Sequence, residues 1–288
     1  MAVLSLEHVS YIYGEGTPFE IKALDDVSLT VREGSVTGII GHTGSGKSTM
    51  VQLFNGLEKP MQGRVLLDGQ DIFAEPKKMR EIRFRVGLVM QYPEYQLFEE
   101  TVGADIAFGP RNMGLPEEEI ARRVADAAAL VGLDRDLLDR SPFELSGGEK
   151  RRAAIAGIMA MKPEILVLDE PAAGLDPRGR DVILHAIRAY GKQTGATVII
   201  VSHSMEDMAA YCDDIIVMAH AKVALSGTRD EVFANAKALT AVGLDVPQIT
   251  RVALLLRARG VEIPDGIYTV EAATAALRRL FGEGRDRG

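Results

Sequence analysis

The chain has 288 residues, 47% of them hydrophobic, and a formal net charge of −8 at pH 7. This length allows one large domain with an appended segment, and the apolar content is sufficient for a sizeable core. The acidic balance argues against a nucleic-acid-binding surface, so we expect no nucleic-acid partner. The single cysteine, Cys212, excludes an intrachain disulfide and is typical of the reducing cytosol.

The sequence contains no apolar run that approaches the roughly 18 residues needed to span a membrane. The N-terminus lacks a basic segment followed by an apolar stretch, so we expect no signal peptide. If the protein works at a membrane, another chain must cross it.

Short apolar strands alternate with helical stretches along most of the chain. Residues 3–31 alternate in polarity and predict a small antiparallel sheet. The later alternation is typical of an α/β fold with a parallel sheet covered by helices. The predicted strands are Val36 to Ile40, Val86 to Met90, Ile165 to Leu168, Val198 to Val201 and Ile215 to Met218. The predicted helices begin after Lys47 and then cover Pro116 to Val131, Gly147 to Met161, Arg178 to Lys192 and Ser204 to Tyr211.

Two changes of composition divide the chain. Between residues 92 and 160 strands give way to helices, which we interpret as a helical insertion in the α/β core. Near Thr240 a second change separates a main domain, residues 1–239, from a small C-terminal extension, residues 240–288. The extension is predicted to hold two helices, Pro247 to Arg259 and Thr269 to Phe281, before a disordered tail at residues 282–288.

The most informative motif is Gly41 to Ser48, which has the form G-x-x-x-x-G-K-[ST]. It follows a predicted buried strand and precedes a predicted helix, which is the setting in which this motif binds phosphate. Glycines let such a loop curl so that its backbone N–H groups face a phosphate, which also meets the positive end of the helix. Lys47 can reach the β- and γ-phosphates, and the Ser48 hydroxyl can ligate Mg²⁺. The predicted nucleotide-binding residues are Gly41, His42, Thr43, Gly44, Ser45, Gly46, Lys47, Ser48 and Thr49.

Three predicted strands end in polar side chains, at the sheet edge where α/β folds bind ligands. Asp169 suits a magnesium ion, and Glu170 could accept a proton from an attacking water. His203 can meet the γ-phosphate, and Gln91 could contact the metal or the water. We expect the side chains of the other histidines to be satisfied in the core, namely His8, His42, His185 and His220.

A second phosphate-binding helix end is predicted where Ser146 caps the helix that begins at Gly147 and Gly148. Because the first loop already serves one nucleotide, this second site makes sense if it serves the ATP of another subunit. Without the other motifs, we would interpret it as a capped helix and nothing more.

Together these motifs resemble the nucleotide-binding subunit of an ATP-binding cassette (ABC) transporter, over about residues 1–235. The resemblance implies a P-loop NTPase fold with a RecA-like parallel core. The phosphate loop is similar to Walker A, Gln91 to the Q-loop, and His203 to the switch histidine. Further matches are Leu145 to Glu149 (signature), Ile165 to Glu170 (Walker B), Ala173 to Asp176 (D-loop) and Tyr13 (adenine stacking).

The chain departs from the family pattern at two positions. Glu149 replaces the commoner glutamine at the end of the signature, and Ala172 replaces a frequent threonine before the D-loop. Neither position makes an essential contact, so we expect ATPase activity to survive. Residues 91–98 resemble the extended Q-loop of energy-coupling factor (ECF) importers, and the chain is similar to their second (A′) ATPase type.

The resemblance implies a head-to-tail dimer with an identical or paralogous ATPase subunit, which clamps two ATP molecules with Mg²⁺. It places Ser48, Gln91 and Asp169 at the metal, and Glu170, His203 and Gln91 in catalysis. A membrane coupling subunit would dock near Tyr92 to Phe98, and a separate membrane subunit would capture a vitamin, another micronutrient or a transition-metal ion. The protein would then lie peripherally at the cytoplasmic face of the cell membrane. Its C-terminal extension, residues 240–288, would either help the protein to dimerise or only cover the core of its own chain.

Three other functions remain open from the sequence. The protein could be the ATPase of an ABC importer fed by a soluble binding protein, although residues 92–98 argue against this. DNA-repair cassettes carry a long coiled coil and translation cassettes occur in pairs, and neither feature is present in the sequence. A P-loop kinase would leave the signature and His203 unexplained.

Overall fold

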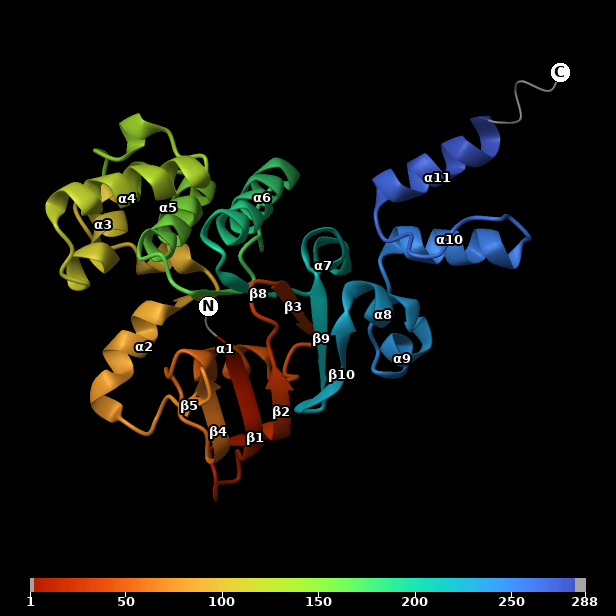
Figure 1. The fold of residues 1–288 in the computed structure, drawn as a ribbon, viewed down its shortest axis with the longest axis horizontal. Helices are drawn as coiled ribbons and strands as arrows, with labels where there is room; N and C mark the ends of the chain where they lie inside the picture. Colours follow the sequence, from red (N-terminus) through yellow and green to blue (C-terminus); the bar gives the residue numbers. More distant parts are fainter. Residues whose placement is uncertain (1–2, 283–288) are drawn as a thin grey trace.

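The computed structural model describes residues 3–282 as two β-sheets with helices packed around them. In Figure 1 the smaller sheet lies below the larger one, and most of the helices lie above. The strands are β1 (Leu4–Tyr13), β2 (Ile21–Thr30), β3 (Val36–Gly41), β4 (Gln62–Leu67), β5 (Gln70–Asp71), β6 (Val86–Val89), β7 (Ile165–Asp169), β8 (Thr197–Val201), β9 (Asp214–Ala219) and β10 (Lys222–Thr228).

The larger sheet has the strand order β10-β9-β3-β8-β7-β6. Its five predicted strands are confirmed, and they pair in parallel. Strand β10 was not predicted and pairs antiparallel with β9, so the sheet is mixed rather than wholly parallel. The turn between them places His220 (φ 50) and Ala221 (φ 63) in the left-handed region. Such turns usually carry asparagine or glycine, so no residue in this turn predicts the hairpin.

The smaller sheet is antiparallel and has the strand order β2-β1-β4-β5. Its first two strands confirm the antiparallel prediction for residues 3–31. Strands β4 and β5 were not predicted, and they join this sheet after the chain has passed through the first helix of the core.

Alternate side chains of the central strands enter two separate cores. Ile199 and Val201 of β8 pack toward the smaller sheet, whereas Val198 and Ile200 pack toward the helices. This two-sided burial explains why these strands are continuously apolar. It also fixes the strand register, because a one-residue slip would exchange the two faces.

The predicted helices are confirmed to within two residues at each end, whereas α2, α3, α8 and α9 were not individually predicted. Between β6 and β7, which the structure describes in full, only helices and turns occur, and α3 and α4 pack against α5. The helices are α1 (Lys47–Phe54), α2 (Met79–Arg85), α3 (Val102–Asn112), α4 (Glu117–Leu130), α5 (Gly147–Ala160), α6 (Pro177–Thr194), α7 (Met205–Tyr211), α8 (Arg229–Ala234), α9 (Ala236–Ala241), α10 (Gln248–Ala258) and α11 (Val270–Gly282).

The C-terminal helices α10 and α11 lie to the right of the larger sheet in Figure 1, on the opposite side from α3 to α5. They enclose a small core of their own, made by Ala253, Ile263, Ile267, Ala273 and Ala276. Leu239, Leu244 and Val246 are instead buried in the main core. The division at residue 240 stays a prediction, and residues 283–288 of the expected disordered tail lie outside the described residues.

Two side-chain expectations can be compared with burial. Cys212 is fully buried against Met208, as expected for a small apolar residue. The expectation of core histidines is wrong for His8, His42, His185 and His220, which are all exposed. His8 and His220 occupy left-handed backbone positions at the surface. Within residues 3–282, no helix combines the length and apolar character needed to cross a membrane.

Candidate nucleotide site

The phosphate loop connects β3 to α1, and its backbone requires glycine at both ends. Gly41 (φ 155) and Gly46 (φ 102) have positive φ values. A Cβ atom on Gly41 would lie 2.3 Å from the carbonyl oxygen of Met218, and one on Gly46 would lie 2.2 Å from that of Ala23. The loop is therefore wedged between β9 and β2, and larger residues would displace it.

Lys47, the first residue of α1, is folded back over the loop. Its Nζ donates hydrogen bonds to the carbonyl oxygens of Gly41 (2.7 Å) and His42 (2.8 Å). Burial lowers the pKa of Lys47, and the nearby carboxylates of Glu170 and Asp169 oppose this change. A partly desolvated ammonium that is held by two carbonyl groups is well placed to bind an arriving anion.

A cavity of about 270 Å³ opens beside the loop and gathers most of the predicted site residues. It is bordered by Ile21 and Ala23, which were not predicted, and by Tyr13, Thr43, Gly44, Gly46, Lys47, Ser48, Thr49, Gln91, Asp169 and Glu170. Gly41 and Ser45 are buried behind it, and Ser45 Oγ is a buried atom without a hydrogen-bond partner among the described residues. The side chain of His42 is turned toward the C-terminal segment.

Asp169 and Ser48 face each other across this cavity. Asp169 is the last residue of β7 and is only 7% exposed, and burial raises the pKa of its carboxyl group. A hydrogen bond from the Ser48 hydroxyl acts in the opposite direction. A buried carboxylate, a hydroxyl and the Gln91 amide form a set of oxygen donors that suits Mg²⁺, which also keeps water and phosphate oxygens as ligands.

Glu170 and His203 are joined by a hydrogen bond. His203 Nδ1 lies 2.9 Å from Glu170 Oε1, and since an ionised carboxylate only accepts, Nδ1 is the donor. Glu170 has a left-handed backbone (φ 50), and its N–H donates to the carbonyl oxygen of Val201 on β8 (2.9 Å). This cross-strand bond holds a conformation that costs a non-glycine residue about 1–3 kcal/mol.

Tyr13 closes one side of the cavity from the end of β1. Its hydroxyl lies 3.2 Å from Thr49 Oγ1, and its ring meets Tyr11 edge-on at a centroid distance of 4.9 Å. Tyr11 is fixed in turn by a hydrogen bond to Glu58 (2.6 Å), which raises the pKa of Tyr11 to about 12. The exposed Tyr13 ring is thus held at the rim, where a base could stack on it.

Ser146, Gly147 and Gly148 lie at the start of α5 and do not line this cavity. Ser146 Oγ accepts a hydrogen bond from the N–H of Glu149, and Glu149 Oε2 accepts from the Ser146 N–H (2.8 Å) and hydroxyl (2.6 Å). The predicted second phosphate site therefore consists of a reciprocally capped helix end that carries a carboxylate.

Arg151 was not predicted as a site residue, although it connects three of the motifs. Its side chain is 4% exposed and forms a bidentate ion pair with Glu94 of the extended Q-loop (2.7 and 3.0 Å). It also donates to the carbonyl oxygen of Ala173 at the D-loop. A single sequence offers no sign that separates this arginine from its neighbours Lys150 and Arg152.

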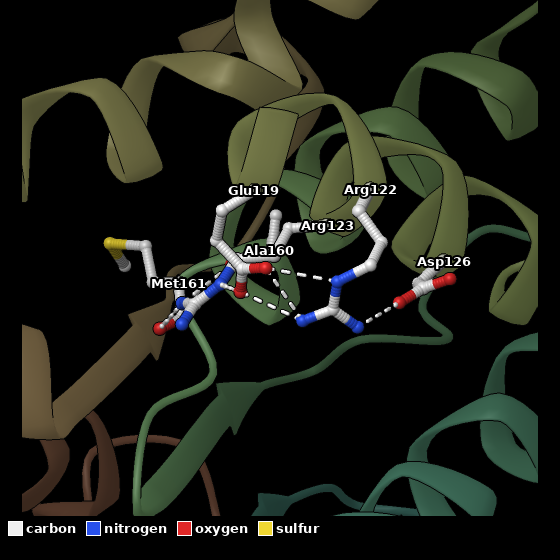
Figure 2. Close-up of polar contacts among 6 residues, drawn as sticks. All are labelled: Glu119, Arg122, Arg123, Asp126, Ala160 and Met161. Carbon is white, nitrogen blue, oxygen red and sulfur yellow. Dashed lines mark hydrogen bonds and ion pairs between the residues drawn. The ribbon is translucent and has the colours of Figure 1, made fainter. Parts of the chain in front are cut away.

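A second arginine anchors the opposite end of α5 (Figure 2). Arg123 of α4 donates to the carbonyl oxygens of Ala160 (3.4 Å) and Met161 (2.9 Å) and pairs with Glu119 (2.7 Å). Arg122 shares Glu119 and also reaches Asp126. The last carbonyl groups of α5 thus receive the charged donor that helix C-termini favour.

Comparisons with known proteins agree with this geometry. The sequence profile described as "ABC transporter" matches residues 24–173. The protein named energy-coupling factor transporter ATP-binding protein EcfA2 from Clostridium acetobutylicum is 53% identical, over 96% of this chain and 98% of its own length. A protein of the same name from Symbiobacterium thermophilum is 53% identical, over 98% of both chains.

Solved structures show the same fold. CbiO1 from Clostridium perfringens, described as part of the ABC transporter complex cbiONQ, has a TM-score of 0.74 and 39% identity, covering 88% of this chain and 98% of its own. The ATP-binding cassette MJ0796, solved as a post-hydrolysis dimer with ADP and phosphate, has a TM-score of 0.71 and 27% identity, covering 78% and 98%.

These findings define the class as an ATP-binding cassette ATPase with a P-loop NTPase fold. The chain belongs to the ABC transporter family and, within it, to the energy-coupling factor transporter ATP-binding proteins.

Proposed function

We propose that the protein is the ATP-hydrolysing subunit of an energy-coupling factor importer, acting through ATP-dependent closure and opening of a dimer. The observation that carries this proposal is that motifs from two separate elements meet at one cavity. Lys47 and Ser48 come from α1, and Asp169 and Glu170 come from β7 and the residue after it. The family relationship and the match to the EcfA2 proteins support the same function.

ATP hydrolysis follows from the positions of these groups. The triphosphate draws Lys47 Nζ away from the carbonyl groups of Gly41 and His42, and the loop N–H groups surround the β-phosphate. A water oxygen attacks the γ-phosphorus, the bond to the β–γ bridging oxygen breaks, and Glu170 accepts the proton of the water. His203, hydrogen-bonded to Glu170 Oε1, keeps that carboxylate oriented, and Gln91 aligns the water. Products are ADP and inorganic phosphate.

Mg²⁺ fits the oxygen donors of Ser48, Asp169 and Gln91. When bound, it neutralises the charge that develops on the phosphate oxygens. The buried position of Asp169, which disfavours an isolated negative charge, gives the site a reason to attract a cation.

The second half of the site comes from another subunit. Ser146, Gly147 and Gly148 do not line the cavity of their own chain, so we assign them to the triphosphate bound by an identical or paralogous partner. In this head-to-tail arrangement, the ATP triphosphate lies between the phosphate loop of one subunit and the start of α5 of the other. Hydrolysis separates the γ-phosphate from ADP and so removes the negative charge that holds the two surfaces together. The subunits then separate.

A membrane coupling subunit is proposed to dock beside the extended Q-loop. A groove of about 410 Å³ runs between α3 and α5 and is bordered by Leu97, Phe98, Phe108 and Ile158. Tyr95 and Phe98 next to it are 84% and 61% exposed, which is unusual for large apolar side chains. Docking there would hold the protein peripherally at the cytoplasmic face, with a separate membrane subunit capturing the micronutrient.

Co-purification tests this function. The tagged protein, produced in its native cell, is expected to bring down two classes of membrane protein and a second ATPase subunit, and the complex should release phosphate from ATP. Lys47→Ala should assemble normally but lose nucleotide binding, because the ammonium contacts phosphate. Recovery of a soluble solute-binding protein instead would favour a conventional ABC importer.

A further inference from the structure

The phosphate loop is hydrogen-bonded to the beginning of the C-terminal segment. His42 Nε2 lies 3.1 Å from the carbonyl oxygen of Val242, across a sequence separation of 200 residues. Since a carbonyl oxygen can only accept, Nε2 carries the proton of this bond. None of the nucleotide-site motifs requires a contact with this segment, so the bond has no place in the scheme above.

The turn that receives His42 is closely fitted to the imidazole ring. Gly243 follows the end of α9 with a φ value of 75, and its N–H donates to the carbonyl oxygen of Thr240 (2.9 Å). A Cβ atom on Gly243 would lie only 2.7 Å from His42 Nε2. On either side of the turn, Leu239 and Leu244 are buried in the main core, so the turn is firmly seated.

The backbone of the same histidine holds the catalytic-site lysine. The carbonyl oxygen of His42 accepts hydrogen bonds from Lys47 Nζ (2.8 Å) and from the N–H of Ser45 (3.1 Å). His42 is therefore hydrogen-bonded to Lys47 through its main chain and to Val242 through its side chain. A displacement of the turn at Val242 and Gly243 would move His42, and with it the carbonyl group that accepts the Lys47 hydrogen bond.

The C-terminal segment makes a second contact near the site. The N–H of Gln248, at the start of α10, donates to Glu206 Oε1 (3.3 Å). Glu206 lies in the first turn of α7, three residues after His203. The same short stretch, residues 242–248, thus contacts the loop that binds phosphate and the helix that follows the switch histidine.

We propose that His42 is a positioning residue that couples the C-terminal extension to the nucleotide site. When Lys47 Nζ leaves the His42 carbonyl group to bind a triphosphate, the phosphate loop shifts, and the His42–Val242 hydrogen bond carries this shift to the extension. The conformation of the extension then depends on whether ATP is bound. Coupling of this kind is reciprocal, so a partner that shifts the extension changes the affinity for ATP by the same factor. The inference rests on the proposed ATP site.

The structure provides matched glycine variants to test this coupling. Gly243→Ala places a methyl group against His42, whereas Gly260→Ala imposes the same left-handed backbone (φ 85) where nothing lies within 4 Å. Binding of a non-hydrolysable ATP analogue to the full chain is expected to weaken about twofold to tenfold in Gly243→Ala, the effect of losing one hydrogen bond. Gly260→Ala should bind normally. Equal binding by both glycine variants overturns the proposal.

Variants of the histidine separate positioning from mere folding. His42→Ala should weaken binding by a similar factor, and His42→Gln should restore it, because its amide N–H can reach the same carbonyl oxygen. In the unaltered protein, nucleotide should change amide hydrogen exchange at residues 239–248, and this response should vanish in His42→Ala. The double variant His42→Ala/Gly243→Ala should bind no more weakly than either single variant, because both remove one contact.

Three further results would overturn the proposal: additive losses in the double variant, no rescue by glutamine, or an unchanged exchange response in His42→Ala. If Gly243→Ala fails to fold, the comparison of His42→Ala with His42→Gln still decides. A lack of nucleotide binding by the unaltered protein would instead contradict the proposed ATP site itself, so the two failures are distinguishable.

Discussion

Glu170 and His203 meet through a 2.9 Å hydrogen bond although 33 residues separate them in the sequence. Each follows the end of a parallel strand, β7 or β8, and these two strands are neighbours in the sheet. The side chain of His203 is 77% exposed and that of Glu170 is 13% exposed. The histidine thus forms the outer, solvent-facing half of a pair whose inner half borders the nucleotide cavity.

Glu170→Gln is expected to slow phosphate release by a factor of about 10² to 10⁴, the contribution typical of a general base, with ATP binding retained. The amide keeps the shape of the side chain but cannot accept the proton of water. The measurement is steady-state phosphate release by the assembled transporter beside equilibrium nucleotide binding. Near-normal release by this variant would rule out the role assigned to Glu170.

Two glycine variants test how the phosphate loop is held. Gly46→Ala should lower the free energy of unfolding by about 2–4 kcal/mol, because a left-handed backbone and a collision with the Ala23 carbonyl add together. Gly44→Ala should cost only about 1 kcal/mol, since its φ value of 80 is similar but nothing lies within 4 Å. Urea unfolding without nucleotide measures both. Equal losses would contradict the wedged loop.

Glu149→Gln is expected to strengthen ATP-dependent dimerisation, because it removes a negative charge from the helix end that we assign to the triphosphate of the partner subunit. The Ser146 hydroxyl, and then the Ser146 N–H, lower the pKa of Glu149. A depressed folded-state pKa stabilises the protein above the ordinary carboxyl pKa, and this stabilisation is lost as the pH falls through the folded-state value. The glutamine variant should lack this pH-dependent contribution to the free energy of unfolding.

Dimerisation of Glu149→Gln can be followed by light scattering in a Glu170→Gln background, which keeps ATP intact. Thermal unfolding between pH 6 and about pH 3 checks the acid dependence. The assignment of the start of α5 to the partner's triphosphate fails if the glutamine variant dimerises more weakly than the protein with glutamate at position 149.

Arg151→Met should lower the free energy of unfolding by about 3–5 kcal/mol, because it leaves the Glu94 carboxylate unpaired in a largely buried place. Arg64→Met breaks the exposed pair with Glu7 and should cost under about 1 kcal/mol. Chemical denaturation of both variants provides the comparison. Similar losses would show that burial does not set the strength of the Arg151 pair.

The sequence predicted those parts of the site that depend on local backbone chemistry. Walker A, the acidic end of β7 and the capped start of α5 are contiguous motifs, and their elements were placed to within two residues. Contacts between distant segments were beyond reach. Arg151 with Glu94, and His42 with Val242, become neighbours only after the sheet and the helical insertion have packed together.

The missed strands have two different origins. The hairpin to β10 was missed because His220 and Ala221 supply positive φ values without the usual glycine or asparagine. Strands β4 and β5 were missed for a different reason, because the Asp68-Gly69 turn between them (φ 54 and 75) is a local signal that favours a two-residue hairpin and was overlooked. For the β10 hairpin, tertiary pairing rather than local preference decides the conformation.

Helix α5 is secured at both ends, by the Ser146–Glu149 capping box and by the Arg123 guanidinium. Its 14 residues span about 21 Å. A helix whose terminal N–H and C=O groups are satisfied in this way resists fraying. Under the proposed docking of a coupling subunit in the α3–α5 groove, a membrane-side movement would therefore shift α5 as one unit and move Ser146 with it, which would set when the dimer captures ATP.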